Sequence, residues 1–218
     1  MPKRFELIVF DWDGTLFDST KAIVACIQAA ARDLGIDEPD EERARYIIGM
    51  GLNDALRHAL PDLPSPRYNE LGERYRYHYL TRDAELTLFD GAIELVEELA
   101  ARGHGLAVAT GKTRLGLDRA LDMTGLGRLF MGSRCADECH SKPHPQMLEE
   151  LMDEFGVRSD ATLMIGDTTH DLLMARNAGV ASLAVAYGAH PRTALEAEQP
   201  LYCATDVPQL TTWLRANA

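Results

Sequence analysis

Long apolar runs and cysteine are both scarce in this 218-residue sequence. No segment approaches the roughly 18 consecutive apolar residues of a membrane-spanning helix, so we expect no membrane association. Basic residues near the start are followed by an apolar segment that Glu6 and Asp11 interrupt, which argues against a secretory signal. The four cysteines are scattered, which fits a reducing compartment better than a disulfide framework. We therefore expect a cytoplasmic protein.

Basic side chains are also in the minority. Lysine and arginine total 22 against 34 aspartates and glutamates, for a formal net charge of -12. Binding of nucleic acid or of an anionic membrane surface depends on basic patches, so we expect neither partner. The sequence also lacks the G-x-x-x-x-G-K-[ST] pattern of a nucleotide-binding P-loop. A small anionic substrate fits this composition only if its pocket is locally positive.

The order of the expected elements indicates an α/β fold. An apolar strand at 7–10 is followed by helical patterns only, at 19–34, 41–48, 52–60 and 68–79. From residue 91 helices alternate with expected strands at 106–110, near 129–131, at 162–165 and at 181–185. Such alternation predicts a Rossmann-like parallel sheet of about five strands flanked by helices. We expect a core of residues 1–18 and 86–218, with residues 19–85 as an inserted all-helical domain.

Two carboxylates, Asp11 and Asp13, follow the first strand and precede Gly14. Strand side chains alternate with period two, so both acids can point over one spot while Trp12 points elsewhere. Like charges this close raise each other's pKa unless a cation lies between them. A strand end followed by an ordinary Asp-Gly turn explains the pair equally well when it is taken alone.

Further polar residues lie at the ends of the other expected strands: one strand ends at Thr110 and is followed by Gly111 and Lys112, and another is followed by Asp167 and Asp171. Lys142 precedes a helix between them. The carboxyl ends of parallel strands meet at one sheet edge, so these groups gather there. A carboxylate can attack phosphorus, a second can transfer protons, and oxygen ligands hold Mg²⁺. Lysine and a hydroxyl can stabilise the charge on a transferring phosphoryl group, so the set suits phosphoryl transfer.

The order of these residues resembles the four motifs of the haloacid dehalogenase superfamily. The matching segments are Asp11-x-Asp13-x-Thr15, Thr110, Lys142 and Gly166-Asp167-x-x-x-Asp171. The helical insert after the first motif is similar to the C1-type cap of the phosphoglycolate-phosphatase-like branch. The family's sheet places its first strand between the second and the fourth, which brings the motifs together.

The resemblance also implies a role for each motif residue. Asp11 would be the nucleophile, and Asp13 the general acid and base, touching the metal only through its backbone carbonyl. Asp167 would bind Mg²⁺ together with Asp11. The remaining roles would be held by these residues: Thr110, Gly111 and Lys142 at the substrate phosphate, and Asp171 as a support of the metal site.

The expected function is a Mg²⁺-dependent phosphatase that hydrolyses a small phosphate monoester, phosphoglycolate-like or a sugar phosphate, through an aspartyl-phosphate. A phosphomutase of the β-phosphoglucomutase type and a noncatalytic phospholigand-binding protein stay open as alternatives. Asp13 argues against a dehalogenase, because a departing halide needs no acid. The expected partner is a small phosphorylated metabolite, and the expected assembly is a monomer or homodimer.

Three further groups of residues have candidate roles. Cys135, Cys139, His140 and His144 suggest zinc, but their spacing departs from C-x-x-C and Lys142 lies among them. His170 lies between Asp167 and Asp171 and is a candidate for contact with substrate, but we expect it to be an exposed histidine in the first turn of a helix. In the family's cap, residues 49–53 often face the active site, so they are candidates for substrate specificity. Candidates for binding a distal anion are Arg45, Arg57, His58, Arg74 and Arg76.

Overall fold

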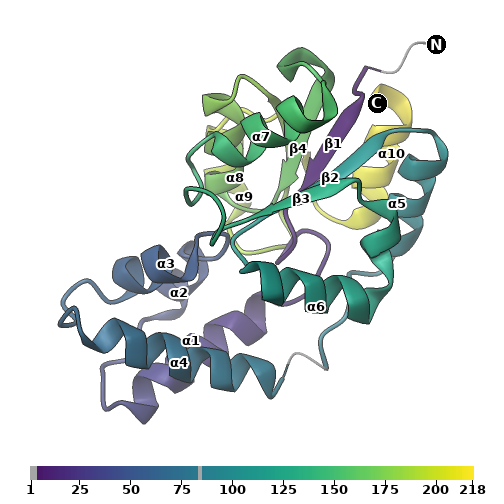
Figure 1. Cartoon of the computed structure of the whole chain (residues 1–218). Helices are drawn as coiled ribbons and strands as arrows, with labels where there is room; N and C mark the ends of the chain where they lie inside the picture. Colours follow the sequence, from purple (N-terminus) through teal and green to yellow (C-terminus); the bar gives the residue numbers. More distant parts are fainter. Residues whose placement is uncertain (1–3, 83–84) are drawn as a thin grey trace.

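A six-stranded parallel sheet forms the centre of the molecule in the computed structural model, which describes residues 4–82 and 85–218. The strand order is β3-β2-β1-β4-β5-β6 (Figure 1). The first strand therefore lies between the second and the fourth, as the resemblance to the haloacid dehalogenase superfamily implies. The strands are β1 (Leu7–Phe10), β2 (Gly105–Thr110), β3 (Gly132–Cys135), β4 (Thr162–Gly166), β5 (Ala181–Val185) and β6 (Cys203–Ala204).

Helices cover both faces of the sheet because the strands are apolar on both sides. Ile8 and Phe10 point to the face covered by α5 (Ala92–Ala101), α6 (Arg114–Thr124) and α10 (Val207–Asn217). Leu7 and Val9 point to the opposite face, which α7 (Gln146–Phe155) and α8 (Thr169–Asn177) cover. The short helix α9 (Arg192–Ala197) packs beside β5 and β6. The predicted α/β fold is confirmed.

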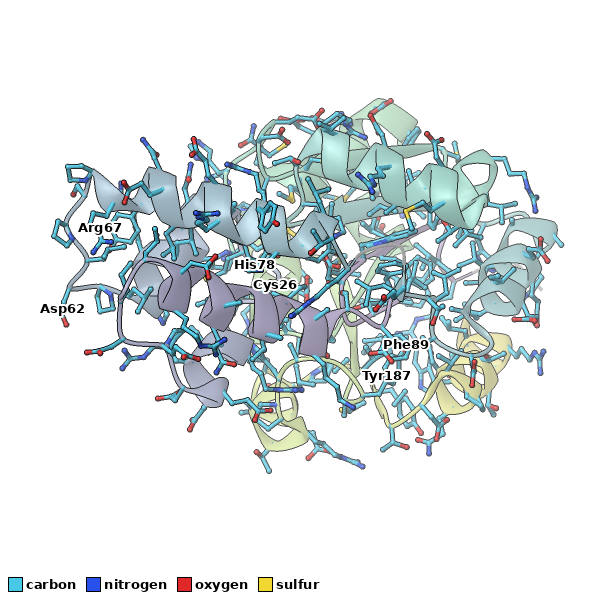
Figure 2. All side chains as sticks on the ribbon, turned by 90° about the horizontal axis from the view of Figure 1, so that it is seen from below. Cys26, Asp62, Arg67, His78, Phe89 and Tyr187 are labelled. Carbon is cyan, nitrogen blue, oxygen red and sulfur yellow. The ribbon has the colours of Figure 1, made fainter. Side chains whose placement is uncertain are left out.

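Between β1 and α5, the described residues contain four α-helices, which form a separate lobe, the cap, below the sheet in Figure 1. They are α1 (Thr20–Asp33), α2 (Glu41–Tyr46), α3 (Leu52–Ala59) and α4 (Arg67–Leu80). Figure 2 shows α1 and α4 side by side, with Asp62 and Arg67 at the end of the cap far from the sheet. Ala30 and Ala31 of α1 pack on Leu71 of α4. The exact domain boundaries at residues 18 and 85 stay a prediction.

Two strand predictions need correction. The expected strand near 129–131 lies at β3 instead, and residues Leu126–Leu129 form a 3-10 helix whose Leu126 enters the core. Because β3 is an edge strand with the sequence Gly-Ser-Arg-Cys, it lacks a continuous apolar run. The two-residue strand β6, at the other edge, is too short for any periodicity. Within the described ranges, no helix has the length and apolar character needed to cross a membrane.

Candidate active site

The carboxyl ends of β1, β2 and β4 bring the predicted site residues together on the side of the sheet that faces the cap (Figure 1). Phe10 of β1 pairs with Val108 of β2 and with Ile165 of β4. The three strands therefore end side by side, and the side chains at their carboxyl ends lie close to one another. All of the following are buried: Asp11, Asp13, Thr110, Lys142, Asp167 and Asp171.

Lys142 lies at the centre of this cluster and is only 1% exposed. Its Nζ donates to Asp11 Oδ1 at 2.6 Å and to Asp171 Oδ1 at 2.7 Å. The other oxygen of Asp171, Oδ2, accepts hydrogen bonds from the backbone N and the hydroxyl of Thr168. Burial alone lowers the pKa of Lys142, but the charges of Asp11 and Asp171 outweigh it and hold the pKa above its ordinary value. Lys142 therefore stays protonated and positively charged.

Asp167 is held by backbone and hydroxyl groups. Its Oδ1 accepts from Thr15 Oγ1 at 3.1 Å, and its Oδ2 accepts from the backbone N of Ala189 at 2.6 Å. Glycines make the space for this carboxylate: a Cβ on Gly14 or Gly188 would lie 2.1 or 2.2 Å from Asp167 Oδ2. Burial, followed by the charge of Asp11, raises the pKa of Asp167 well above its ordinary value.

Asp11, Asp167 and Asp171 form the acidic cluster of the site. Each offers one carboxylate oxygen, and these oxygens lie within 4.8 Å of one another. Asp11 Oδ2 is buried and has no hydrogen-bond partner among the residues that the structure describes. Burial raises the pKa of Asp11 to about 7 although Lys142 opposes the rise. Buried carboxylates need a compensating charge, and an all-oxygen set suits a hard divalent cation, so the cluster fits a metal ion.

Asp13 lies apart from that cluster and has its own partners. Its Oδ1 accepts from Ser19 Oγ at 2.6 Å and lies 3.1 Å from Lys112 Nζ. The Lys112 ammonium in turn donates to the Tyr79 hydroxyl of the cap at 2.9 Å. A metal contact through the Asp13 backbone carbonyl stays a prediction.

The cap loop at 49–51 lies against the core loops of the site. A Cβ on Gly111 would lie 2.5 Å from Met50 O, and one on Gly49 would lie 3.2 Å from Thr168 Oγ1. Gly51 N donates to Ser141 Oγ at 2.8 Å. Because Gly111 has no side chain, the backbone of the cap loop approaches the core backbone closely at this point. This placement supports a specificity role for residues 49–53, which stays a prediction.

A second contact between cap and core was not foreseen from the sequence. His170 and His190 donate from Nε2 to the backbone carbonyl of Tyr46, at 2.7 and 2.9 Å. Arg45 donates to the carbonyls of Gly188 and Ala189. The expectation that His170 is exposed is wrong, because the cap covers the first turn of α8 and leaves His170 only 4% exposed. Only the position of the cap reveals this contact.

Two of the remaining candidates, Arg57 and His58, have structural partners in the cap. Arg57 lies over the ring of Tyr68, and His58 stacks on Tyr46. Arg74 and Arg76 are exposed. All four cysteines are free, and burial raises the pKa of Cys135 to about 12 and that of Cys139 to about 11. Within the described ranges, Cys135, Cys139, His140 and His144 do not converge as metal ligands.

The family model of the haloacid dehalogenase-like hydrolases matches residues 8–185, which is most of the chain and includes every motif residue of the site. The chain belongs to the haloacid dehalogenase-like hydrolase family. The expected resemblance and the expectation of a hydrolase are therefore confirmed.

Relatives and solved structures match this member of the family over nearly its whole length. A protein of Dickeya dadantii named "Probable phosphatase IndB" is 36% identical over 200 residues, covering 89% of this chain and 86% of its own. A 5'-nucleotidase of Pseudomonas aeruginosa is 34% identical over 216 residues, covering 98% and 97%. The structure of a hydrolase from Pseudomonas syringae has a TM-score of 0.89 at 24% identity, covers 99% of both chains and supports the fold.

Proposed function

We propose that this hydrolase is a Mg²⁺-dependent phosphatase that acts on a small phosphate monoester through an aspartyl-phosphate on Asp11. One observation carries the proposal. Lys142 binds Asp11 Oδ1, while Asp11 Oδ2, in a buried acidic cluster, has no hydrogen-bond partner within residues 4–82 and 85–218. An oxygen held in this way is available to a metal ion or to an attacked phosphorus atom, and the adjacent cation neutralises negative charge.

Each residue of the cluster has a proposed role in binding. Asp11 and Asp167 would bind Mg²⁺, with Asp171 holding Lys142 beside them. The metal would supply positive charge to the phosphoryl oxygens and keep the buried carboxylates ionised. Thr110, Gly111 and Lys142 would donate hydrogen bonds to the phosphoryl group at the end of β2, where the backbone of Gly111 is free of a side chain.

The reaction would proceed in two displacements at phosphorus. In the first, an Asp11 oxygen forms a bond to phosphorus, the ester P–O bond breaks, and Asp13 gives its proton to the leaving oxygen. In the second, Asp13 takes a proton from water, the water oxygen attacks phosphorus, and the bond to Asp11 breaks. Asp11 returns as a carboxylate and inorganic phosphate leaves.

The cap and the surroundings fit this scheme. The nucleophile Asp11 is 0% exposed, so the cap opens for substrate and closes to exclude bulk water. A phosphorylated metabolite is the proposed partner, in the cytoplasm, with the protein as monomer or homodimer. Substrate candidates are phosphoglycolate, sugar phosphates, nucleotides and pyrophosphate.

Hydrolysis of p-nitrophenyl phosphate with added Mg²⁺ tests the proposal. We expect turnover that EDTA abolishes and that Asp11→Asn removes while the circular dichroism spectrum is unchanged. Asp62→Asn, an exposed position at the tip of the cap (Figure 2), is the matched control and keeps full activity. A folded protein with no turnover on the whole substrate panel contradicts the proposal and favours a phospholigand-binding protein. Conversion of a sugar phosphate to its isomer without phosphate release identifies a mutase.

A further inference from the structure

Lys112 joins the cap to Asp13, although neither the sequence motifs nor the reaction scheme assigns it a function. We propose that Lys112 and Tyr79 are positioning residues for Asp13, so that the closed cap aims the proton-transferring carboxyl at the leaving oxygen. This inference rests on the proposed function, because it presupposes that Asp13 transfers the proton. It concerns a different step from phosphate binding and metal binding.

The backbone of Lys112 is fixed to the core at the end of β2. Its N–H donates to Thr110 Oγ1 at 3.2 Å, and its carbonyl accepts from the N–H of Ala136 at 3.0 Å. Its neighbour Gly111 lies directly under the backbone of the cap loop at 49–51. The Lys112 side chain therefore starts from a rigid position, and its direction depends on what its ammonium group binds.

The ammonium group binds one partner from each domain. Nζ lies 3.1 Å from Asp13 Oδ1 on the core side and donates to the Tyr79 hydroxyl at 2.9 Å on the cap side. It also lies 4.6 Å from the centre of the Tyr79 ring, a favourable distance for a cation over an aromatic face. Because Tyr79 belongs to α4, this second contact exists only when the cap is closed.

The contacts of Asp13 explain what this bridge fixes. Ser19, at the start of the cap, and Lys112 both approach the same oxygen, Oδ1. With Oδ1 held from two sides, the carboxyl group cannot rotate freely, and Oδ2 is left to meet the leaving oxygen. The side chains of Lys112 and Asp13 are each only 11% exposed, so water screens this pair far less than it screens an ion pair on the surface.

If Lys112 only stabilises the fold, its replacement affects the activity on different substrates differently than if it positions Asp13. Loss of a stabilising ion pair lowers activity on every substrate alike. If the Asp13 carboxyl is no longer held in position, the activity falls most on substrates whose leaving group most needs a proton. Phenyl phosphate has a more basic leaving group than p-nitrophenyl phosphate and nearly the same shape, so the two separate these outcomes.

The experiment compares kcat/KM on these two aryl phosphates for the wild type, Lys112→Met, Lys112→Arg and Tyr79→Phe. We expect Lys112→Met to lose about 100-fold on phenyl phosphate and less than about fivefold on p-nitrophenyl phosphate. Lys112→Arg keeps most of the activity on both. Tyr79→Phe shows a smaller loss with the same preference and adds nothing further in the Lys112→Met background, since it acts through that lysine.

Lys21→Met and Tyr77→Phe are matched controls, because both residues are exposed and Tyr77 lies on the same helix as Tyr79. Equal losses on both substrates, no loss on either, or an arginine variant as impaired as the methionine variant would overturn the inference. Absence of wild-type turnover on both substrates contradicts the proposed function itself, so the two failures are distinguishable.

Discussion

The ammonium of Lys142 lies 2.6 Å from Asp11 Oδ1, with both side chains buried beneath the cap. Asp171 binds the same ammonium from the other side at 2.7 Å. Removal of one partner from a buried ion pair leaves a charge without compensation in a medium of low dielectric constant. The stability of the site therefore depends on this lysine as much as the proposed chemistry does.

Replacement of Lys142 by methionine removes the cation and leaves two buried carboxylates. We expect the free energy of unfolding to fall by about 3 kcal/mol at pH 8 and the phosphatase activity to be lost. Urea denaturation followed by circular dichroism measures the first effect. The loss of stability shrinks toward pH 5, since Asp11 then takes up a proton. An equal loss at both pH values contradicts this account.

Metal binding is expected to weaken below neutral pH. Burial raises the pKa of Asp11 to about 7, so at lower pH a proton competes with the metal for the carboxylate. We expect Mg²⁺ affinity, measured by isothermal titration calorimetry, to fall by up to about tenfold per pH unit between pH 7 and 5. Asp62→Asn leaves this pH dependence unchanged. An affinity independent of pH in this range is the opposing result.

Gly188 is expected to tolerate no side chain. A Cβ at this position would lie 2.2 Å from Asp167 Oδ2, so Gly188→Ala displaces the carboxylate proposed to bind Mg²⁺. We expect at least about a tenfold loss of Mg²⁺ affinity, together with a large loss of activity. Gly127→Ala is the control, because its Cβ would make only an ordinary contact at 3.6 Å. Unchanged Mg²⁺ affinity in Gly188→Ala would show that Asp167 is not a ligand.

His190 is expected to make the protein sensitive to acid. Burial lowers its pKa from 6.5 to about 4, so the folded protein keeps the ring neutral while the unfolded chain takes up a proton below pH 6.5. The stabilisation is complete above pH 6.5 and is lost as the pH falls toward 4, by up to about 3 kcal/mol. The Nε2 contact to Tyr46 O makes glutamine the closest non-titrating substitute.

Unfolding measurements at pH 7 and pH 4.5 on wild type and His190→Gln test this prediction. Other titrating groups cancel in the difference between the two proteins. We expect the wild type to lose more stability than the variant on acidification. His144→Gln, at an exposed histidine, behaves as the wild type does. Parallel losses in wild type and His190→Gln rule out His190 as the cause.

The sequence by itself determined the alternation of strands and helices and the identity of the acids that meet at the sheet edge, whereas the order of the central strands followed only from the resemblance to a known family. The first two features depend on neighbouring residues only. A polar residue that directly follows an apolar strand lies at the carboxyl end of that strand, independently of distant parts of the chain. The edge strand β3 was predicted a few residues too early because it lacks a continuous apolar run, and β6 was missed because two residues are too few to show a period.

Only the tertiary structure decided how the cap meets the core. Tyr79 and Lys112 are 33 residues apart, and Tyr46 and His190 are 144 apart, so no local pattern links either pair. Those contacts depend on the angle at which the helical cap sits over the sheet, which is set by packing of many side chains at once. The same packing buries His170 and leaves Asp13 between Ser19 and Lys112.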